Sequence, residues 1–357
     1  MRRVEIQVRG SGGRQGWPTP GCRCAACQQA GVNGTARLPF SVLINGVLEL
    51  PGPDAGHARG HRVRQLAGGW DVTGPDGTRL LAGPCPEVPA DAGRYDAVLL
   101  DLIGDPAQLG RLRRRGAVTG GTLVLAGFAD HRIRSERELA RRCGFWGAVP
   151  VRDGDRYTVP GAAGRSPGGR RPWRVLVLGG SGSGKSAEAE LRLAAEPEVT
   201  YVATGRVDPA DPEWTARIAA HQDRRPSWWH TRESTELAGV LGAFSGAVLV
   251  DSVTTWLAGV MDDCGAWDAQ DGAEGDAGGP GAAAVRLAER TDALVAAWRQ
   301  ADGYVVAVSD ETGLGVVPDT RAGRLFRDEL GRLNQRLAAE ADEFVLVVAG
   351  RPMLTAD

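Results

Sequence analysis

The stretch that decides the fold is RVLVLGGSGSGKSAEAE, residues 174–190. It contains Lys185, the only lysine in a 357-residue chain in which Lys and Arg together number 42. An ammonium is a compact point charge that fits among phosphate oxygens in a tight loop, whereas a guanidinium is a broad planar fork. Gly179, Gly184, Lys185 and Ser186 match the spacing G-x-x-x-x-G-K-[ST] of the phosphate-binding loop. The single lysine therefore indicates a nucleoside triphosphate site.

The flanking sequence has the character that this motif requires. WRVLVLGG, residues 173–180, is a short apolar run that predicts a strand, and SAEAELRLAAE, residues 186–196, is rich in helix formers. In such a loop backbone N–H groups hold the phosphates, the lysine reaches the β and γ oxygens and the hydroxyl binds Mg²⁺. The alternative is a glycine-rich turn that matches by chance. The predicted phosphate-binding residues are Gly179, Gly180, Ser181, Gly182, Ser183, Gly184, Lys185 and Ser186.

Composition and charge set the domain organisation. Residues 1–172 carry 25 Arg against 15 acidic residues, whereas the whole chain has a net charge of −2, so the second half is acidic. Between the halves GAAGRSPGGRRP, residues 161–172, predicts a linker, which leaves one domain at 1–160 and another at 173–357. No apolar run reaches the roughly 18 residues of a membrane span and MRRVEIQVRGSGG lacks a signal-peptide core, so we expect a cytoplasmic protein. RLRRRG, residues 111–116, has no interleaved aromatics and predicts a solvated helix face rather than a nucleic-acid contact.

The second domain reads as alternating strands and helices. Four further β-branched apolar runs follow the first, namely EVTYVATG (198–205), GAVLVDS (246–252), GYVVAVS (303–309) and EFVLVVAG (343–350). This pattern predicts an α/β fold, a P-loop NTPase-like parallel sheet with flanking helices. Ligands of such sheets bind at the carboxyl ends of the strands, which here carry Thr204, Asp251 and Ser309. Asp251 is placed to hold Mg²⁺ opposite the phosphate loop; the alternative is a helix N-cap.

One segment carries chemistry that is unusual for a simple kinase. In DPEWTARIAAHQDRRPSWWHTRE, residues 211–233, His221 is followed by Arg224 and Arg225. A neutral imidazole nitrogen can attack phosphorus to give a phosphoramidate, and arginines bind phosphate strongly. From these residues alone, a surface or structural histidine remains the alternative.

Taken together, the motifs of residues 173–352 resemble the bifunctional adenosylcobinamide kinase/adenosylcobinamide-phosphate guanylyltransferase family of cobalamin biosynthesis. The matching motifs are GGSGSGKS, YVATG, RIAAHQDRRPSWW followed by TRE, VLVDSVTTWL, VSDETGLGVVPDTRAGRLFRDELGRLNQRLA and ADEFVLVVAG. Where this family usually has Ser-Asn-Glu, the chain has Ser309-Asp310-Glu311.

The resemblance implies two activities with ATP or GTP as substrates and Mg²⁺ as cofactor. One is phosphorylation of the corrinoid adenosylcobinamide, in which Lys185 is catalytic; the other is transfer of GMP from GTP through a guanylyl adduct of His221. It also implies that the protein forms a homo-oligomer, namely a trimer. Under this reading His230 is a surface residue. The alternatives are another P-loop kinase or NTPase and a non-catalytic GTP-binding regulator. Beyond the phosphate loop, the implied nucleotide-binding residues are Ala203, Thr204, Gly205, Gln222, Asp223, Arg224, Arg225, Glu233 and Asp251.

The N-terminal half begins with VEIQVRGSGGRQGWPTPGCRCAACQQAG, residues 4–31, which resembles the start of metallo-β-lactamase-fold hydrolases of the phosphodiesterase type. SVLINGVLELPGPDAG, residues 41–56, predicts the next strand pair. The H-x-H-x-D-H signature of that family is absent, since only His57, His61 and His131 precede the linker. We therefore expect a smaller, β-rich α+β domain that is a degenerate, non-hydrolytic form of the fold.

The cysteines of this half point to a structural metal. Cys22, Cys24 and Cys27 lie within six residues, and three thiolates so close suit one tetrahedral Zn²⁺ if a fourth ligand completes the site. His131 is the candidate, because its position resembles that of a late histidine in some phosphodiesterase members of the family. The alternative is a trio of free or mutually oxidised cysteines.

Overall fold

The computed structural model describes residues 4–52, 56–58, 60–159, 172–205, 225–244, 246–267 and 280–354. The chain divides into two compact units, one of residues 1–169 with 194–197 and one of residues 170–193 with 198–357. This division falls inside the predicted linker, most of which lies outside the described residues.

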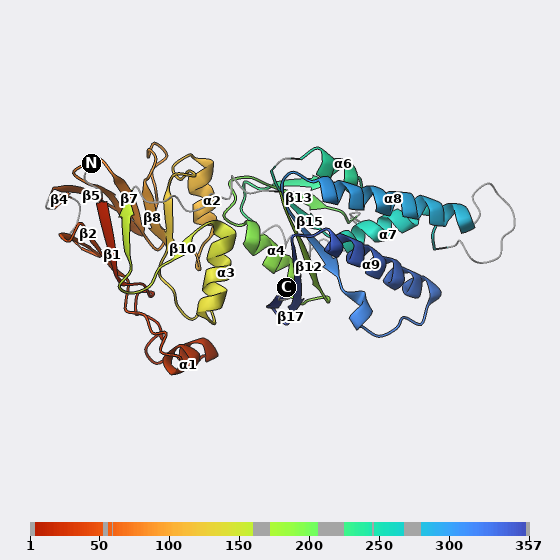
Figure 1. The fold of residues 1–357 in the computed structure, drawn as a ribbon, viewed down its shortest axis with the longest axis horizontal. Helices are drawn as coiled ribbons and strands as arrows, with labels where there is room; N and C mark the ends of the chain where they lie inside the picture. Colours follow the sequence, from red (N-terminus) through yellow and green to blue (C-terminus); the bar gives the residue numbers. More distant parts are fainter. Residues whose placement is uncertain are drawn as a thin grey trace. The chain divides into compact units, whose positions relative to one another are not determined.

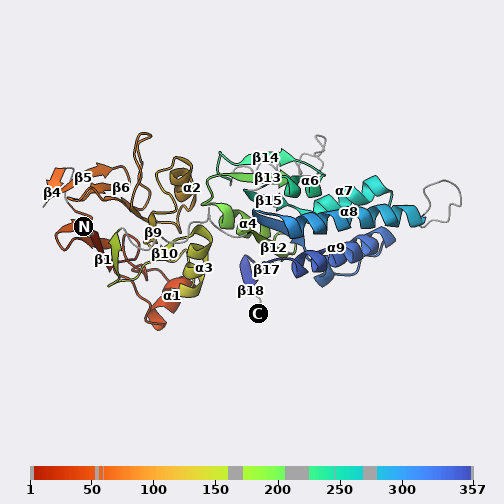
Figure 2. The same cartoon turned by 45° about the horizontal axis from the view of Figure 1, so that its top comes forward.

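The second unit contains a seven-stranded sheet with the order β14-β13-β15-β16-β12-β17-β18. Figure 2 shows β14 toward one edge and β18 toward the other. All neighbouring strands run parallel except β17 and β18. The predicted parallel α/β sheet is therefore confirmed, with two edge strands that the sequence pattern did not indicate. The strands are β12 (Trp173–Gly179), β13 (Val199–Ala203), β14 (His230–Glu233), β15 (Ala247–Asp251), β16 (Tyr304–Asp310), β17 (Glu343–Val348) and β18 (Arg351–Leu354).

Helices cover both faces of this sheet because successive residues of its strands point to opposite faces and both sets are apolar. Val175 and Val177 of β12 pack with Leu193 of α4, whereas Leu176 and Leu178 belong to the core formed with the other helices. Figure 1 shows α7, α8 and α9 together on one side and α4 on the other. The helices are α4 (Lys185–Leu193), α6 (Leu237–Gly242), α7 (Val253–Cys264), α8 (Pro280–Gln300) and α9 (Arg321–Ala339), with the short 3₁₀ helix η2 (Thr312–Leu314).

The first unit consists of two sheets that share one apolar core. A four-stranded sheet has the order β11-β1-β2-β3 and a seven-stranded mixed sheet the order β10-β9-β8-β7-β6-β5-β4. The predicted strand pair is confirmed, because β2 and β3 are joined by a tight turn in which Asn45 (φ 52°) and Gly46 (φ 68°) are both left-handed, as an Asn-Gly hairpin requires. The strands are β1 (Val4–Gly10), β2 (Ser41–Ile44), β3 (Leu48–Leu50), β4 (Gly56–Ala58), β5 (His61–Leu66), β6 (Gly69–Thr73), β7 (Arg79–Gly83), β8 (Ala97–Leu100), β9 (Leu123–Ala126), β10 (Val149–Pro150) and β11 (Arg156–Val159).

Within its described residues this unit has the helices α1 (Ala25–Val32), α2 (Ala107–Arg114) and α3 (Glu136–Trp146). The helix predicted at residues 111–116 is confirmed for residues 111–114 of α2, whose Leu109 and Leu112 are buried while Arg111 pairs with Asp105; residues 115–116 lie in the turn that follows. None of the helices in the described ranges combines the length and the apolar character that a membrane crossing needs.

Candidate nucleotide and metal sites

The phosphate loop connects the interior strand β12 to the first turn of α4, so its N–H groups lie at a helix N-terminus, where anions are stabilised. Gly182 (φ 68°) and Gly184 (φ 95°) adopt the left-handed backbone that the tight turn requires. At Gly179 a Cβ would lie 2.7 Å from the carbonyl oxygen of Val347, so only glycine allows the neighbouring strand to approach this closely. The predicted strand, loop and helix are all present.

The lysine that singled out this loop forms an ion pair. Lys185 Nζ lies 2.7 Å from Asp310 Oδ1 and donates a hydrogen bond of 3.2 Å to the carbonyl oxygen of Gly180. Its side chain is only 13% exposed, so the ammonium is held at the loop rather than extended into solvent. A phosphate that binds here competes with the Asp310 carboxylate for the same cation.

Asp310 is fixed in place by its backbone. It ends β16 and pairs with Gly179, the residue that ends β12. Its N–H donates to Thr254 Oγ1 at 2.7 Å, and its carbonyl oxygen accepts from the buried Asn334 amide at 3.0 Å. Two helices, α7 and α9, therefore hold this carboxylate beside the lysine. Sequence reasoning noted Asp310 as a departure from the family pattern but gave it no role.

A cavity of about 870 Å³ opens over the phosphate loop. One wall is the loop and the start of α4, including Lys185 and Ser186. The other comes from the chain after β16 and from α9, including Val316, Phe326 and Arg327. A volume of this size is that of a small-molecule site.

Asp251, the predicted Mg²⁺ ligand, ends β15 and accepts a hydrogen bond of 2.9 Å from the hydroxyl of Tyr201. Burial, together with the nearby Asp251 carboxylate, raises the pKa of Tyr201 well above its usual value, so the hydroxyl stays protonated and donates. The alternative reading of Asp251 as a helix cap is wrong, because Ser252 caps α7 by accepting from the Thr255 N–H.

Arg225 lies over the ring of Tyr201, with its guanidinium carbon 3.2 Å from the ring centroid, and its Nε is 3.8 Å from Glu190. Its side chain is 7% exposed and does not line the cavity described above. Arg225 thus anchors the chain that follows the histidine segment against β13 and α4. Residues 206–224, which include His221, Gln222, Asp223 and Arg224, lie outside the described residues.

The remaining predicted nucleotide residues lie at neighbouring strand ends. Thr204 is buried, and its hydroxyl donates to the Ser252 carbonyl at 2.6 Å and accepts from the Ser252 N–H at 3.0 Å. Ala203 ends β13 and pairs with the exposed Glu233 at the end of β14. Gly205 follows, partly exposed. The hydroxyl of Thr204 is therefore engaged in joining β13 to α7.

In the first unit the structure brings the predicted metal ligands together. The ligand atoms of Cys22, Cys24, Cys27 and His131 all lie within 4.8 Å of one another, and Cys22 Sγ is 3.9 Å from His131 Nδ1. Donors around one tetrahedral zinc lie about 4 Å apart, given Zn–S bonds near 2.3 Å. A hydrogen bond from the Cys27 backbone lowers the pKa of the Cys24 thiol, which favours the thiolate. These four residues are the one such cluster among the described residues.

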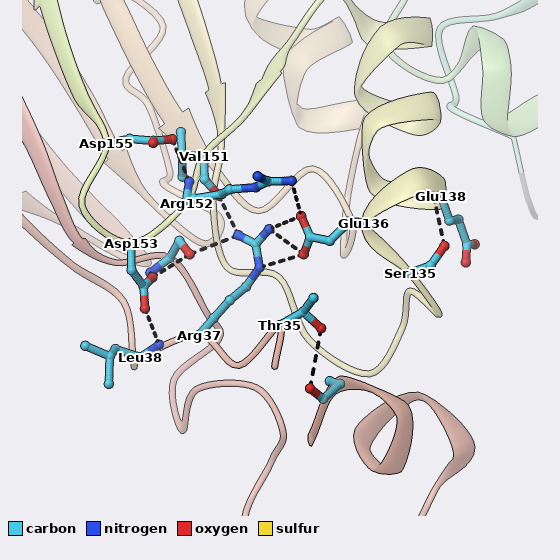
Figure 3. Close-up of polar contacts among 12 residues, drawn as sticks. Thr35, Arg37, Leu38, Ser135, Glu136, Glu138, Val151, Arg152, Asp153 and Asp155 are labelled. Carbon is cyan, nitrogen blue, oxygen red and sulfur yellow. Dashed lines mark hydrogen bonds and ion pairs between the residues drawn. The ribbon is translucent and has the colours of Figure 1, made fainter. Parts of the chain in front are cut away.

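The cysteine segment leaves the sheet as a loop that is closed at its base. Trp17 and Arg37 exchange two backbone hydrogen bonds, of 2.9 and 2.6 Å. Figure 3 shows the Arg37 guanidinium in the middle of a polar network, where it donates to both oxygens of Glu136 at 2.8 Å and to the carbonyl of Val151. Because Glu136 begins the helix that follows His131, this buried ion pair ties the cysteine loop to the histidine.

Comparisons with known proteins agree with the geometry of the second unit. A strand, a G-x-x-x-x-G-K-S loop and a helix on a parallel sheet define a P-loop nucleotide-binding protein. The chain belongs to the family described as cobinamide kinase/cobinamide phosphate guanyltransferase, whose model matches residues 175–354. The family prediction for the C-terminal half is confirmed.

Two relatives show how much of the chain this covers. The bifunctional adenosylcobalamin biosynthesis protein CobU of Salmonella typhimurium is 39% identical over 183 residues, 49% of this chain and 96% of the relative. The corresponding protein CobP of Pseudomonas aeruginosa is 38% identical over 188 residues, 50% of this chain and 95% of the relative. The chain is thus about twice as long as the part that these relatives share with it, and the family model leaves residues 1–174 unmatched.

Solved structures add little. An ATPase of a bacterial type III secretion system matches 49% of this chain and 51% of its own at a TM-score of 0.28, and a diphosphatase of the PhnP family matches 65% and 94% at 0.16, each with 14% identity. At these scores neither comparison defines a shared fold.

The contact between Asp310 and Lys185 generates a first prediction. Asp310→Asn removes an anion that competes with phosphate, so we expect nucleoside triphosphates to bind roughly fivefold more tightly, a change of about 1 kcal/mol. Calorimetric titration with a triphosphate measures the effect, and the corresponding nucleoside, which lacks phosphates, is the matched control. Weaker triphosphate binding would show that the carboxylate helps to hold the nucleotide instead.

A second prediction concerns the hydrogen bond between Tyr201 and Asp251. Tyr201→Phe leaves the ring under Arg225 but removes this hydrogen bond from the carboxylate, so we expect a several-fold higher Mg²⁺ requirement for nucleotide turnover and a loss of about 1 kcal/mol in unfolding free energy. Tyr157→Phe is the control, because Tyr157 makes the same bond with Asp155, at 3.0 Å, in the first unit. The positioning role is refuted if the two variants lose stability alike and neither changes the Mg²⁺ requirement.

Proposed function

We propose that the protein phosphorylates adenosylcobinamide with a nucleoside triphosphate and then transfers GMP from GTP to the product, giving adenosylcobinamide-GDP. The observation that carries this proposal is the family match over residues 175–354, which includes an intact phosphate loop with Lys185 at the cavity. The relatives, named bifunctional adenosylcobalamin biosynthesis proteins, support both activities. We assign this function to a P-loop domain of residues 173–357.

In the kinase step the acceptor is the aminopropanol hydroxyl of the corrinoid. Its oxygen bonds to the γ-phosphorus, the bond to the β-phosphate oxygen breaks, and the hydroxyl proton is released. Lys185 leaves Asp310 and contacts the β and γ oxygens, while the loop N–H groups hold the phosphates. Ser186 and Asp251 would hold Mg²⁺, which neutralises charge on the transferring phosphoryl group.

The guanylyl step uses a covalent intermediate. A neutral imidazole nitrogen of His221 bonds to the α-phosphorus of GTP and pyrophosphate leaves. A phosphate oxygen of adenosylcobinamide phosphate then attacks the same phosphorus, which forms the diphosphate and returns the free imidazole. Gln222, Asp223 and Arg224 would bind the nucleotide beside it, with Ala203, Thr204, Gly205 and Glu233 at the strand ends. The two-stage route avoids joining two polyanions in one step.

A labelling experiment tests this mechanism. With GTP labelled at the α-phosphate, His221→Ala should lose the acid-labile GMP adduct completely while it keeps phosphorylation of cobinamide. His230→Ala is the matched control, because His230 is an exposed residue at the start of β14 and should keep the adduct. A label that persists in His221→Ala would move the nucleophile elsewhere.

The same experiment separates the other candidate functions. A simple P-loop kinase would retain no label in the unsubstituted protein, and a non-catalytic regulator would bind GTP without turnover. We further propose a cytoplasmic homotrimer, as the family resemblance implies, which light scattering tests directly.

For residues 1–160 we propose a degenerate metallo-β-lactamase-like fold with a structural zinc. Two sheets that share one core and the cluster of three cysteines with His131 support this proposal. Asp101 and Asp130, which follow strands β8 and β9, are both held by Arg132, at 2.7 and 2.8 Å. Because a guanidinium neutralises these carboxylates, they are poor ligands for a catalytic metal, and the unit is proposed to be non-hydrolytic.

Metal analysis of the full-length protein tests the zinc. A closed site with four protein ligands stabilises without catalysing, so we expect about one zinc per chain. Cys24→Ser should lose it and His131→Ala should bind it more weakly, whereas Cys85→Ser, an exposed cysteine outside the cluster, should keep it. Two tightly bound metals with phosphodiesterase activity would overturn the non-hydrolytic assignment, and a metal-free protein would leave a cluster of free thiols.

A further inference from the structure

The two walls of the phosphate cavity differ in character. The phosphate loop provides backbone N–H groups, hydroxyls and Lys185, whereas the opposite wall includes Val316, Pro318 and Phe326. Next to Val316 the chain also exposes Leu314 and Val317. We refer to Leu314, Val316 and Val317 as the apolar lip; their exposed fractions are 77%, 94% and 58%. Large apolar side chains clustered at the mouth of a cavity are typical of a ligand surface.

The lip is held outward by polar contacts on both sides. Before it, the Arg327 guanidinium donates to the carbonyl of Gly313 at 2.7 Å. After it, Arg324 donates to the carbonyls of Pro318 and Asp319 at 3.0 and 2.7 Å. Both arginines project from α9, which Thr320 caps by accepting from the Gly323 N–H. The backbone of the lip is therefore fixed to a helix while its apolar side chains face solvent, an arrangement that burial within this unit does not explain.

The reaction suggests which ligand covers this surface. The acceptor hydroxyl must reach the γ-phosphate, which the loop and Lys185 hold at the floor of the cavity. In the proposed substrate this hydroxyl sits on a short aminopropanol arm, and the body of the molecule is a corrin macrocycle whose rim carries apolar methyl groups between its amide arms. An arm that enters the cavity leaves the macrocycle at its mouth, beside Val316.

We propose that the apolar lip is the docking surface for the corrin ring of the acceptor, an inference that rests on the proposed kinase function. Burial of Val316 and its neighbours against the ring supplies binding energy remote from the reacting atoms, and Phe326 extends the same apolar wall into the cavity. Leu314 and Val317 are not among the residues that line the phosphate cavity, and Val316 lies on the wall opposite the phosphate loop. Changes there should therefore alter acceptor binding and leave nucleotide binding unaffected.

The test compares serine substitutions of matched exposure. In Val316→Ser and Val317→Ser the KM for cobinamide should rise about tenfold, with the KM for the nucleoside triphosphate and the GMP labelling of His221 unchanged. Val285→Ser is the control, since Val285 on α8 is 57% exposed, like Val317, and does not line the cavity. These positions are exposed, so the variants should fold normally.

Three outcomes would overturn the inference, and they are distinguishable. If the unsubstituted protein binds nucleotide but does not phosphorylate cobinamide, the proposed function fails and the docking surface with it. If the unsubstituted protein is active and the lip variants keep its KM for cobinamide, the docking surface alone fails. If Val316→Ser lowers the oligomeric mass in light scattering, a second copy of the chain covers the lip in place of the corrinoid.

Discussion

The parallel pairing of β12 with β16 is the constraint on which the phosphate site depends. It places Gly179 opposite Asp310. The start of the phosphate loop and a carboxylate 131 positions later therefore meet at the carboxyl ends of two neighbouring strands. The register is itself fixed by burial, because a slip of one residue would exchange the faces that pack on α4 and on α7–α9. The distance of 2.7 Å between Lys185 and Asp310 is thus a consequence of how the core packs.

A buried ion pair has the corresponding role in the first unit. Arg37 closes the base of the cysteine loop and binds Glu136, the first residue of α3. Its side chain is 4% exposed, so loss of Glu136 would leave a buried guanidinium without its carboxylate, which costs far more than loss of a surface pair. The same contact sets the separation of the cysteine loop from His131, five residues before Glu136. Stability and metal geometry are therefore coupled at this point.

Sequence reasoning succeeded where local pattern and burial agree. The five apolar runs of the second domain, the phosphate loop and the strand pair in residues 41–56 are each specified within a few residues, and all are present. It missed β14, whose His230–Glu233 are all exposed, and the antiparallel β18, because edge strands have no two-sided apolar signal. Contacts between distant segments, such as Tyr201 with Asp251, depend on strand order, which no local pattern encodes. The aspartate in Ser309-Asp310-Glu311 was the one visible signal for the lysine partner.

Hydrogen-bond satisfaction separates two kinds of polar residue at the strand ends. The hydroxyl of Thr204 is buried and bonded to Ser252 and to Thr255 Oγ1, so a nucleotide could engage this hydroxyl only by breaking the junction between β13 and α7, and the proposed contact at Thr204 falls to its backbone. Lys185 and Asp310 also contact each other, but they line a cavity, where arriving phosphate oxygens can replace the carboxylate at little cost. Residue type alone makes Thr204 and Lys185 equally good candidates for binding a nucleotide. The geometry shows that the Thr204 hydroxyl joins β13 to α7, whereas Lys185 can exchange its carboxylate partner for a phosphate.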